Sequence, residues 1–168
     1  WTEEMVLKVQ KYKTARYTLE GPLQIGAALH GASEGQKKAL SDFAIPVGIA
    51  FQIIDDILGF YGDPKRGGSA DIADIKEGKR TLLIMKALEK GSSEEKERIR
   101  NALGNKNLTM QEADAVRDII RGTGSEKHSR MVARELSEKG TAALVGADLD
   151  DEVVQYLKDL ARYLLGRA

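Results

Sequence analysis

Apolar residues recur at three- and four-residue intervals along most of this 168-residue chain, and strand-like alternation is scarce. This spacing gathers apolar side chains on one face of a helix, so the sequence predicts an all-α fold. The 17 glycines and 3 prolines divide the pattern into segments. The predicted helices cover residues 3–19, a segment beginning at Leu23, residues 34–60 and residues 78–90, followed by three or four more helices.

Turn and capping signals mark the ends of these predicted helices. The sequence EGP, residues 20–22, is expected to stop the first helix. Ser33 with Gln36 has the spacing of a capping box before the long helix, and Thr109 with Glu112 repeats it further along. No internal repeat is evident, and 168 residues, 42% of them hydrophobic, are enough for one compact domain with a core.

The long predicted helix carries two adjacent aspartates, Asp55 and Asp56, within an apolar run. At about 100° per residue, Gln52, both aspartates and Gly59 share one arc of the helix. Such a polar stripe can face solvent or line a polar cavity. Adjacent like charges are costly in a helix, and a divalent cation would reverse that cost. Because Mg²⁺ commonly binds one or two carboxylates together with water and substrate phosphates, the stripe favours a metal–diphosphate site.

Basic residues follow this helix. Residues 61–77, rich in glycine and charge, predict a loop. Lys76, Lys79 and Arg80 then lie near the predicted start of the next helix. Cations at such a position can bind phosphate together with the helix terminus, so we expect these side chains to face the same anion as the aspartates.

Composition excludes several kinds of chemistry. The 26 basic and 26 acidic residues cancel, so no global field attracts nucleic acid or an anionic membrane. The absence of cysteine excludes disulfides, thiolate zinc sites and cysteine nucleophiles, and fits a cytoplasmic location. No uninterrupted apolar run reaches the roughly 18 residues of a membrane span, and no signal peptide is evident. The two histidines, His30 and His128, are interpreted as surface or packing residues.

Three segments, KTARYTLEGPLQIGAAL, GIAFQIIDDILGFYGDP and DIKEGKRTLLIMKAL, together resemble the C-terminal half of the trans-isoprenyl diphosphate synthases of the polyprenyl synthetase family. The geranylgeranyl and farnesyl diphosphate synthases are the most similar type. The resemblance is strong over about residues 5–90 and weaker beyond. It implies an all-α bundle of the isoprenoid synthase type, of which residues 1–168 form about half, as the C-terminal portion of one domain. The implied reaction is the Mg²⁺-dependent condensation of isopentenyl diphosphate with an allylic diphosphate, by ionisation, condensation and elimination.

The resemblance also implies roles for individual residues. Asp55 and Asp56 match the start of the second aspartate-rich motif, which helps to hold Mg²⁺ against the allylic diphosphate. Lys79 matches a lysine that contacts diphosphate, and Phe51 matches an aromatic residue that borders the isoprenoid pocket. These matches identify one wall of a substrate site.

Lys13, Thr14 and Gln52 match family residues beside the allylic diphosphate and the nascent carbocation, and are therefore interpreted as catalytic and substrate-binding residues. Loss of diphosphate from an allylic carbon creates a cation, and metal ions with lysines neutralise the leaving group. Threonine and glutamine can turn oxygen dipoles toward that cation. The departed diphosphate could then accept the proton, so no histidine or cysteine base is needed.

Two residues depart from the family pattern within the chain. Gly59 occupies the fifth position of a motif that commonly reads Asp-Asp-x-x-Asp. Ser69 stands where the loop normally carries a lysine, about five residues ahead of Asp74; Lys65 or Arg66 could replace that lysine.

The first aspartate-rich motif and the residues for isopentenyl diphosphate belong to an N-terminal half that this chain, beginning at Trp1, does not contain. We therefore expect a fragment that is inactive alone and associates with that missing half, as a homodimer, or both. Two alternatives stay open. A non-catalytic partner subunit of a heteromeric prenyl synthase is mildly favoured by Gly59 and Ser69, whereas a class I terpene cyclase relative is disfavoured by the Lys-Thr and Gly-Lys-Arg-Thr segments.

Overall fold

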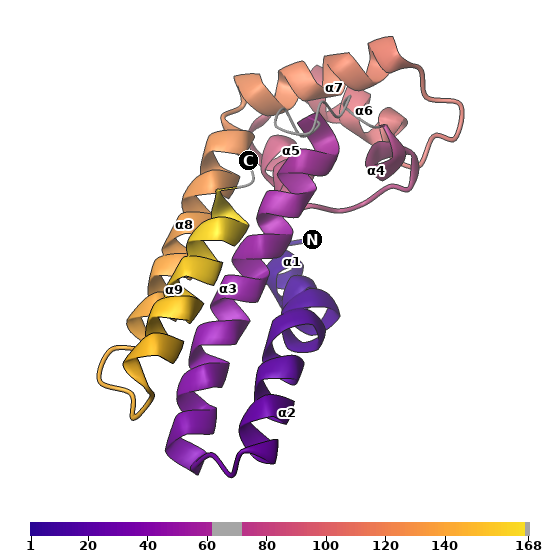
Figure 1. Ribbon diagram of the computed structural model, residues 1–168. Helices are drawn as coiled ribbons and strands as arrows, with labels where there is room; N and C mark the ends of the chain where they lie inside the picture. The colour runs from indigo at the N-terminus through magenta and orange to yellow at the C-terminus, as the bar shows by residue number, and fades with distance from the viewer. Residues whose placement is uncertain (62–71, 167–168) are drawn as a thin grey trace. The chain divides into compact units, whose positions relative to one another are not determined.

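The computed structural model describes residues 1–61 and 72–166. Within these residues the chain forms helices and turns and no strand, which confirms the all-α prediction (Figure 1). The elements are α1 (Glu3–Gln10), the π-helical segment η1 (Lys11–Glu20), α2 (Gly21–Leu29), α3 (Glu34–Tyr61), α4 (Ala73–Lys76), α5 (Leu82–Lys90), α6 (Ser93–Ala102), α7 (Met110–Gly122), α8 (Ser125–Ala142) and α9 (Asp151–Leu165).

The chain divides into two compact units. The first unit contains Trp1–Val6 and Asp55–Met131, and the second contains Leu7–Ile54 with the described residues from 132 to 166. Helices α1, α3 and α8 each contribute residues to both units.

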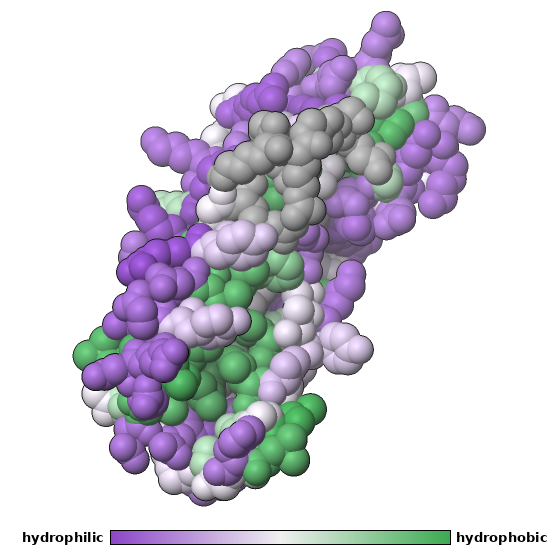
Figure 2. Space-filling view, in the orientation of Figure 1, coloured by the Kyte–Doolittle hydropathy of each residue, from purple (hydrophilic) through white to green (hydrophobic). Residues whose placement is uncertain are grey.

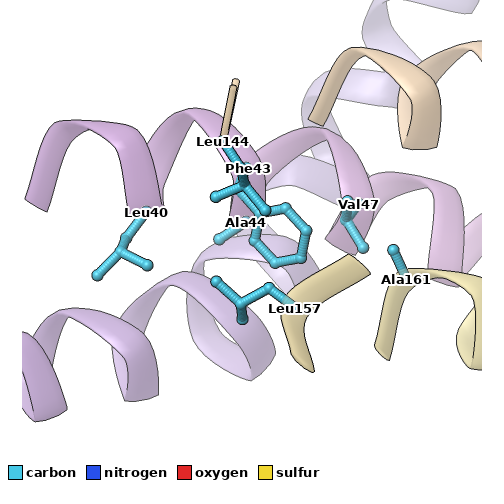
Figure 3. Close-up of a cluster of buried hydrophobic side chains, with 7 residues drawn as sticks. All are labelled: Leu40, Phe43, Ala44, Val47, Leu144, Leu157 and Ala161. Atoms are coloured by element: carbon cyan, nitrogen blue, oxygen red, sulfur yellow. The ribbon is translucent and has the colours of Figure 1, made fainter. Parts of the chain in front are cut away.

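The core of the second unit lies along α3. Phe43, Ala44 and Val47 of this helix are fully buried. They pack with side chains from α9 and from the segment that follows α8; the cluster is Leu40, Phe43, Ala44, Val47, Leu144, Leu157 and Ala161 (Figure 3). Gly140 allows α8 to approach α3 closely, because a Cβ at this position would lie 2.7 Å from the Val47 Cγ2 atom. The apolar positions at three- and four-residue intervals therefore face one another as the sequence predicts.

In the first unit, α5, α6 and α7 pack against one another. Leu82, Leu83 and Ile84 of α5 are each 1% exposed, and Ile99 of α6 and Ile120 of α7 are fully buried. These side chains form the apolar centre on which the charged surfaces of the same helices are built.

Two predicted helix starts are confirmed by their caps. Ser33 donates its N–H to the Gln36 Oε1 atom at 2.8 Å and accepts the Gln36 N–H at 3.2 Å. Thr109 and Glu112 form the same reciprocal pair at 2.8 and 3.3 Å. Asp150 caps α9 by accepting a backbone N–H of its first turn. Local signals of this kind do not depend on the rest of the fold.

The predicted stop at residues 20–22 is wrong. Glu20 and Gly21 both have right-handed helical backbone angles, so η1 continues directly into α2. The Gly21 N–H donates to the Arg16 carbonyl five residues earlier, which is π-helical spacing. Pro22 lies in the first turn of α2, where a missing N–H costs little.

The prediction of a continuous loop over residues 61–77 is also corrected where the structure describes it. Tyr61 is the last residue of α3, and residues 73–76 form the single turn of α4. Residues 62–71 lie outside the described residues.

The helix predicted for residues 78–90 begins later, at Leu82. Gly78 has φ of +70°, a left-handed conformation that ends the preceding turn. Thr81 is extended and accepts the Ile84 N–H at 3.4 Å, which places the start of α5 after Thr81.

Helix α3 is long and apolar enough, by length and composition, to cross a membrane. However, 67% of its most apolar 18-residue window is buried inside the structure. A core helix of a soluble protein has the same character, so this finding is weak evidence for a membrane span.

Candidate functional site

Thr14 and Gln52, 38 residues apart in sequence, meet inside the second unit. The Thr14 hydroxyl donates a hydrogen bond of 2.6 Å to the Gln52 Oε1 atom. Thr14 lies in η1 and is 7% exposed, while Gln52 lies on α3 and is half-buried. π-Helical segments frequently occur at functional sites, because they change the direction in which side chains point.

A glycine brings the two elements together. Gly48 lies one helical turn before Gln52, and a Cβ there would be 2.6 Å from the Ala15 Cα atom. Ala15 is fully buried, so the η1 backbone rests directly on α3. The neighbouring Lys13 is exposed, which leaves its ammonium group accessible to an anion, and Phe51 is half-buried.

The polar stripe predicted on α3 is present. Asp55 is exposed, and Gln52, Asp56 and Gly59 are half-buried. The apolar residues between them are buried: Ile53, Ile54, Ile57 and Leu58. The two carboxylates therefore lie on the accessible side of a helix whose other side is core.

These carboxylates fit Mg²⁺ only as part of its coordination. Among the described residues, no group of three or more His, Cys, Asp or Glu side chains is arranged to hold a metal ion. Asp55 and Asp56 supply hard oxygen ligands, and Mg²⁺ commonly completes its octahedron with water and substrate phosphates. The donor set suits a metal bound together with a diphosphate.

Lys79 lies beside the acidic residues of the first unit. Its ammonium group forms an ion pair with Asp74 and lies 3.7 Å from a Glu77 carboxylate oxygen. The hydrogen bond with Asp74 raises the pKa of Lys79 above its ordinary value despite partial burial, and the charges of Asp74, Glu77 and Asp56 add to this effect. Lys79 is therefore a cation in the field of Asp74, Glu77 and Asp56.

Arg80, which the sequence predicts to face an anion, contacts an aromatic ring in the structure. Its guanidinium lies over the Trp1 ring, 4.9 Å from the ring centroid. This cation–π contact gives Arg80 a packing role in the first unit. Ser69, Lys65 and Arg66, which concern the expected loop lysine, lie outside the described residues.

One contact was not visible from the sequence. Asp74 is only 15% exposed and approaches Gly59 so closely that a Cβ on Gly59 would lie 2.7 Å from the Asp74 Oδ2 atom. Fifteen residues separate the two positions, so helical periodicity gave no signal. The glycine in place of the usual motif aspartate was the one available indication.

In the part of the chain that the structure describes, the polar contacts of the two histidines involve none of the candidate site residues. His30 is exposed, with its Nδ1 atom 3.0 Å from the Gly26 carbonyl. The His128 Nε2 atom lies 3.0 Å from a Glu3 carboxylate oxygen. Both contacts agree with surface or packing roles.

Comparison with known proteins decides the family. Residues 2–120 match the family model described as polyprenyl synthetase. The chain belongs to this family. It is 43% identical over 115 residues to a geranylgeranyl diphosphate synthase of Sulfolobus acidocaldarius, a match that covers 68% of this chain and 33% of that protein. A geranylgeranyl diphosphate synthase of Saccharolobus solfataricus is 36% identical over 138 residues, covering 82% of this chain and 40% of that protein.

The fold of this family member agrees with solved structures of polyprenyl synthetases. A geranylgeranyl pyrophosphate synthase from Corynebacterium glutamicum, complexed with isoprenyl diphosphate and magnesium, matches with a TM-score of 0.91 and 36% identity. The match covers 99% of this chain and 47% of that one. The chain thus has the isoprenoid synthase helical fold and spans less than half the length of the relatives named here.

Proposed function

We propose that residues 1–168 form the C-terminal portion of a single isoprenoid synthase domain and supply the wall that binds Mg²⁺ and the allylic diphosphate. The reaction is the condensation of isopentenyl diphosphate with an allylic diphosphate. The observation that carries this proposal is the accessible Asp55–Asp56 pair on α3, three residues beyond the Gln52 side chain that Thr14 fixes. The family match supports chain elongation rather than terpene cyclisation.

The residue types suit the ionisation step. When bound, Mg²⁺ neutralises the charge that develops on the departing diphosphate. Lys13 and Lys79 provide charge-assisted hydrogen bonds to diphosphate oxygens. Since the Thr14 hydroxyl donates a hydrogen bond to the Gln52 Oε1 atom, the lone pairs of the Thr14 oxygen remain available to face positive charge. Phe51 borders the isoprenoid chain, and the diphosphate itself accepts the proton lost at elimination.

The proposed site is tested by binding of Mg²⁺ with inorganic pyrophosphate to the full chain, measured by calorimetry. We expect Mg²⁺-dependent binding that Asp55→Ala and Asp56→Ala each weaken about tenfold or more, since each removes a charged metal ligand. The matched control is Asp150→Ala, which removes the cap of α9 and should lower stability without changing affinity. Equal losses for Asp55→Ala and Asp150→Ala would contradict the assignment.

Turnover is tested separately with radiolabelled isopentenyl diphosphate, farnesyl diphosphate and Mg²⁺. An extended prenyl product that disappears in Asp55→Ala supports a complete catalytic site. Pyrophosphate binding without product supports a wall that requires residues from another polypeptide or segment. Gly59, which replaces a motif carboxylate, favours the second candidate, a non-catalytic partner subunit of a heteromeric prenyl synthase; that candidate predicts product only when a catalytic partner is added.

Association is part of the same proposal, either with the remainder of the isoprenoid synthase fold or with a second copy in a homodimer. Large apolar side chains of the second unit are exposed, including Tyr17 at 82%, Leu29 at 80% and Val145 at 74%. Figure 2 shows hydrophobic residues gathered over part of this unit. Exposed apolar patches of this kind mark protein interfaces. Sedimentation that finds a monomer binding no hydrophobic dye would contradict it. We place the reaction in the cytoplasm, consistent with the absence of cysteine.

A further inference from the structure

The Asp74 carboxylate fills the space beside Gly59 where a side chain of residue 59 would lie. Gly59 lies on the polar stripe, four residues after Asp55 and three after Asp56. A Cβ at this position would lie 2.7 Å from the Asp74 Oδ2 atom and 3.5 Å from its carboxyl carbon. The first distance is well inside van der Waals contact, so any side chain here would displace the Asp74 carboxylate. The Asp74 carboxylate therefore lies on the polar stripe of α3 at the level of residue 59, although residue 59 itself has no side chain.

The same carboxylate is committed to a cation. Asp74 pairs with the Lys79 ammonium, and it is the more buried partner, with 15% of its side chain exposed against 41% for Lys79. Asp74 is therefore the more enclosed partner, whereas the exposed side of Lys79 can still meet an anion. Through this pair, the space left by Gly59 determines where the Lys79 charge lies.

We propose that Gly59, Asp74 and Lys79 act as one positioning unit. Gly59 leaves room on α3, and Asp74 enters that room and supplies from the next segment the carboxylate that α3 lacks. Asp74 in turn holds Lys79 near the end of the polar stripe, about one helical turn beyond Asp55 and Asp56. Asp74 and Gly59 are positioning residues that act through Lys79. The consequence for diphosphate rests on the proposed function, because it requires Lys79 to contact the leaving group.

The coupling is tested without any substrate by competitive labelling of lysine amines with acetic anhydride, followed by peptide mass spectrometry of the full chain. The exposed Lys90 serves as the internal reference. We expect Gly59→Ala and Asp74→Asn each to raise the Lys79 labelling rate about threefold, the size expected for losing a half-exposed ion pair. The double variant should label no faster than Asp74→Asn alone, because both changes break the same contact.

Two further variants sharpen this test. Gly26→Ala is the matched control, since a Cβ on this helical glycine meets nothing within 4 Å and should leave the Lys79 rate unchanged. Gly59→Asp combined with Asp74→Ala returns the carboxylate to α3, and slow labelling of Lys79 should be restored. The proposal is overturned if Gly59→Ala leaves Lys79 as slow as in the parent chain, or if the two single effects multiply in the double variant.

Binding of Mg²⁺ with inorganic pyrophosphate is then compared across the same variants. Affinity should fall about threefold in Gly59→Ala and return in the Gly59→Asp, Asp74→Ala chain, in step with the labelling rate. If labelling follows the expected pattern but affinity is the same in all variants, the unit does not serve diphosphate and that part of the proposal fails. If the parent chain binds no pyrophosphate, the proposed function fails, while the labelling cycle still decides whether the three residues are coupled.

Discussion

The buried Thr14 hydroxyl of η1 donates a 2.6 Å hydrogen bond to the Gln52 side chain of α3. A buried hydrogen bond of this kind contributes about 1 kcal/mol to stability, and Thr14→Val removes the donor while keeping the side-chain volume. We therefore expect Thr14→Val to lower the free energy of unfolding by about 1 kcal/mol, measured by urea denaturation.

Thr14→Ser is the control for this prediction, because serine keeps the hydroxyl and loses one methyl group. It should still bind Mg²⁺ with pyrophosphate like the parent chain, as the geometry around Gln52 is preserved. A valine variant as stable as the parent chain would show that the bond adds nothing to the stability of the second unit.

The close approach of η1 to α3 depends on Gly48. In Gly48→Ala the new Cβ would lie 2.6 Å from the Ala15 Cα atom and 2.7 Å from its Cβ. Ala15 is fully buried, and neither atom can move without a shift of the η1 backbone. We expect a loss of about 2 kcal/mol in the free energy of unfolding, measured in urea, together with weaker pyrophosphate binding.

Gly26→Ala tests whether this loss comes from the clash. Gly26 lies within α2 and has open space around its missing side chain. Alanine there should be neutral or stabilising by up to about 1 kcal/mol, because alanine favours helix. Similar losses at both positions would point to glycine flexibility rather than to the helix contact.

These contacts show which parts of the fold and site the sequence can predict. The caps at Ser33 and Thr109 and the stripe containing Asp55 depend on residues three or four apart, and each was predicted correctly. The stop at residues 20–22 was wrong, because proline within a first turn is compatible with a helix that continues. Sequence rules that consider only neighbouring residues cannot tell whether such a proline ends a helix or lies within a continuous one.

Contacts between residues far apart in the sequence could not be predicted either. The approach of Asp74 to Gly59 and the stacking of Arg80 on Trp1 both depend on how whole helices pack. No periodicity in the sequence encodes such distances. The family resemblance placed Thr14 and Gln52 near one substrate, but the hydrogen bond between them emerged only from the structure.

Arg117 of α7 holds the C-terminal end of α3 in the first unit. It is 4% exposed, and its Nε atom donates to the Phe60 carbonyl at 2.7 Å. Carbonyls in the last turn of a helix lack partners within the helix, so this bond satisfies one of them. We expect Arg117→Met to lower the free energy of unfolding by about 2 to 3 kcal/mol in urea denaturation.

Arg121 provides the control for this prediction on the same helix. Its guanidinium lies 4.8 Å from the centroid of the Tyr61 ring, and 59% of its side chain is exposed. An exposed cation–π contact contributes only about 0.5 to 1 kcal/mol, so Arg121→Met should be much milder than Arg117→Met. The reverse order would assign the anchoring of α3 to Arg121.

Glu3 makes the stability of the first unit depend on pH. One of its carboxylate oxygens lies 2.9 Å from the Lys86 ammonium and 3.0 Å from the His128 Nε2 atom. Partial burial raises the pKa of Glu3, but the hydrogen bonds and charges of Lys86 and His128 outweigh burial, so the pKa lies below its ordinary value. The ionised carboxylate therefore stabilises the folded state, and this contribution is fully present only above the unfolded-state pKa of about 4.3.

Glu3→Gln should thus lower the free energy of unfolding by about 0.5 to 1 kcal/mol near pH 7. The difference between Glu3→Gln and the parent chain should shrink as the pH falls through the lowered pKa of Glu3, because protonation removes the same charge in the parent chain. Urea denaturation at several pH values measures this, with the exposed Glu4→Gln on the same helix as control. If the difference in free energy of unfolding between Glu3→Gln and the parent chain stays constant below the lowered pKa of Glu3, Glu3 contributes through packing alone, independent of its pairing with Lys86 and His128.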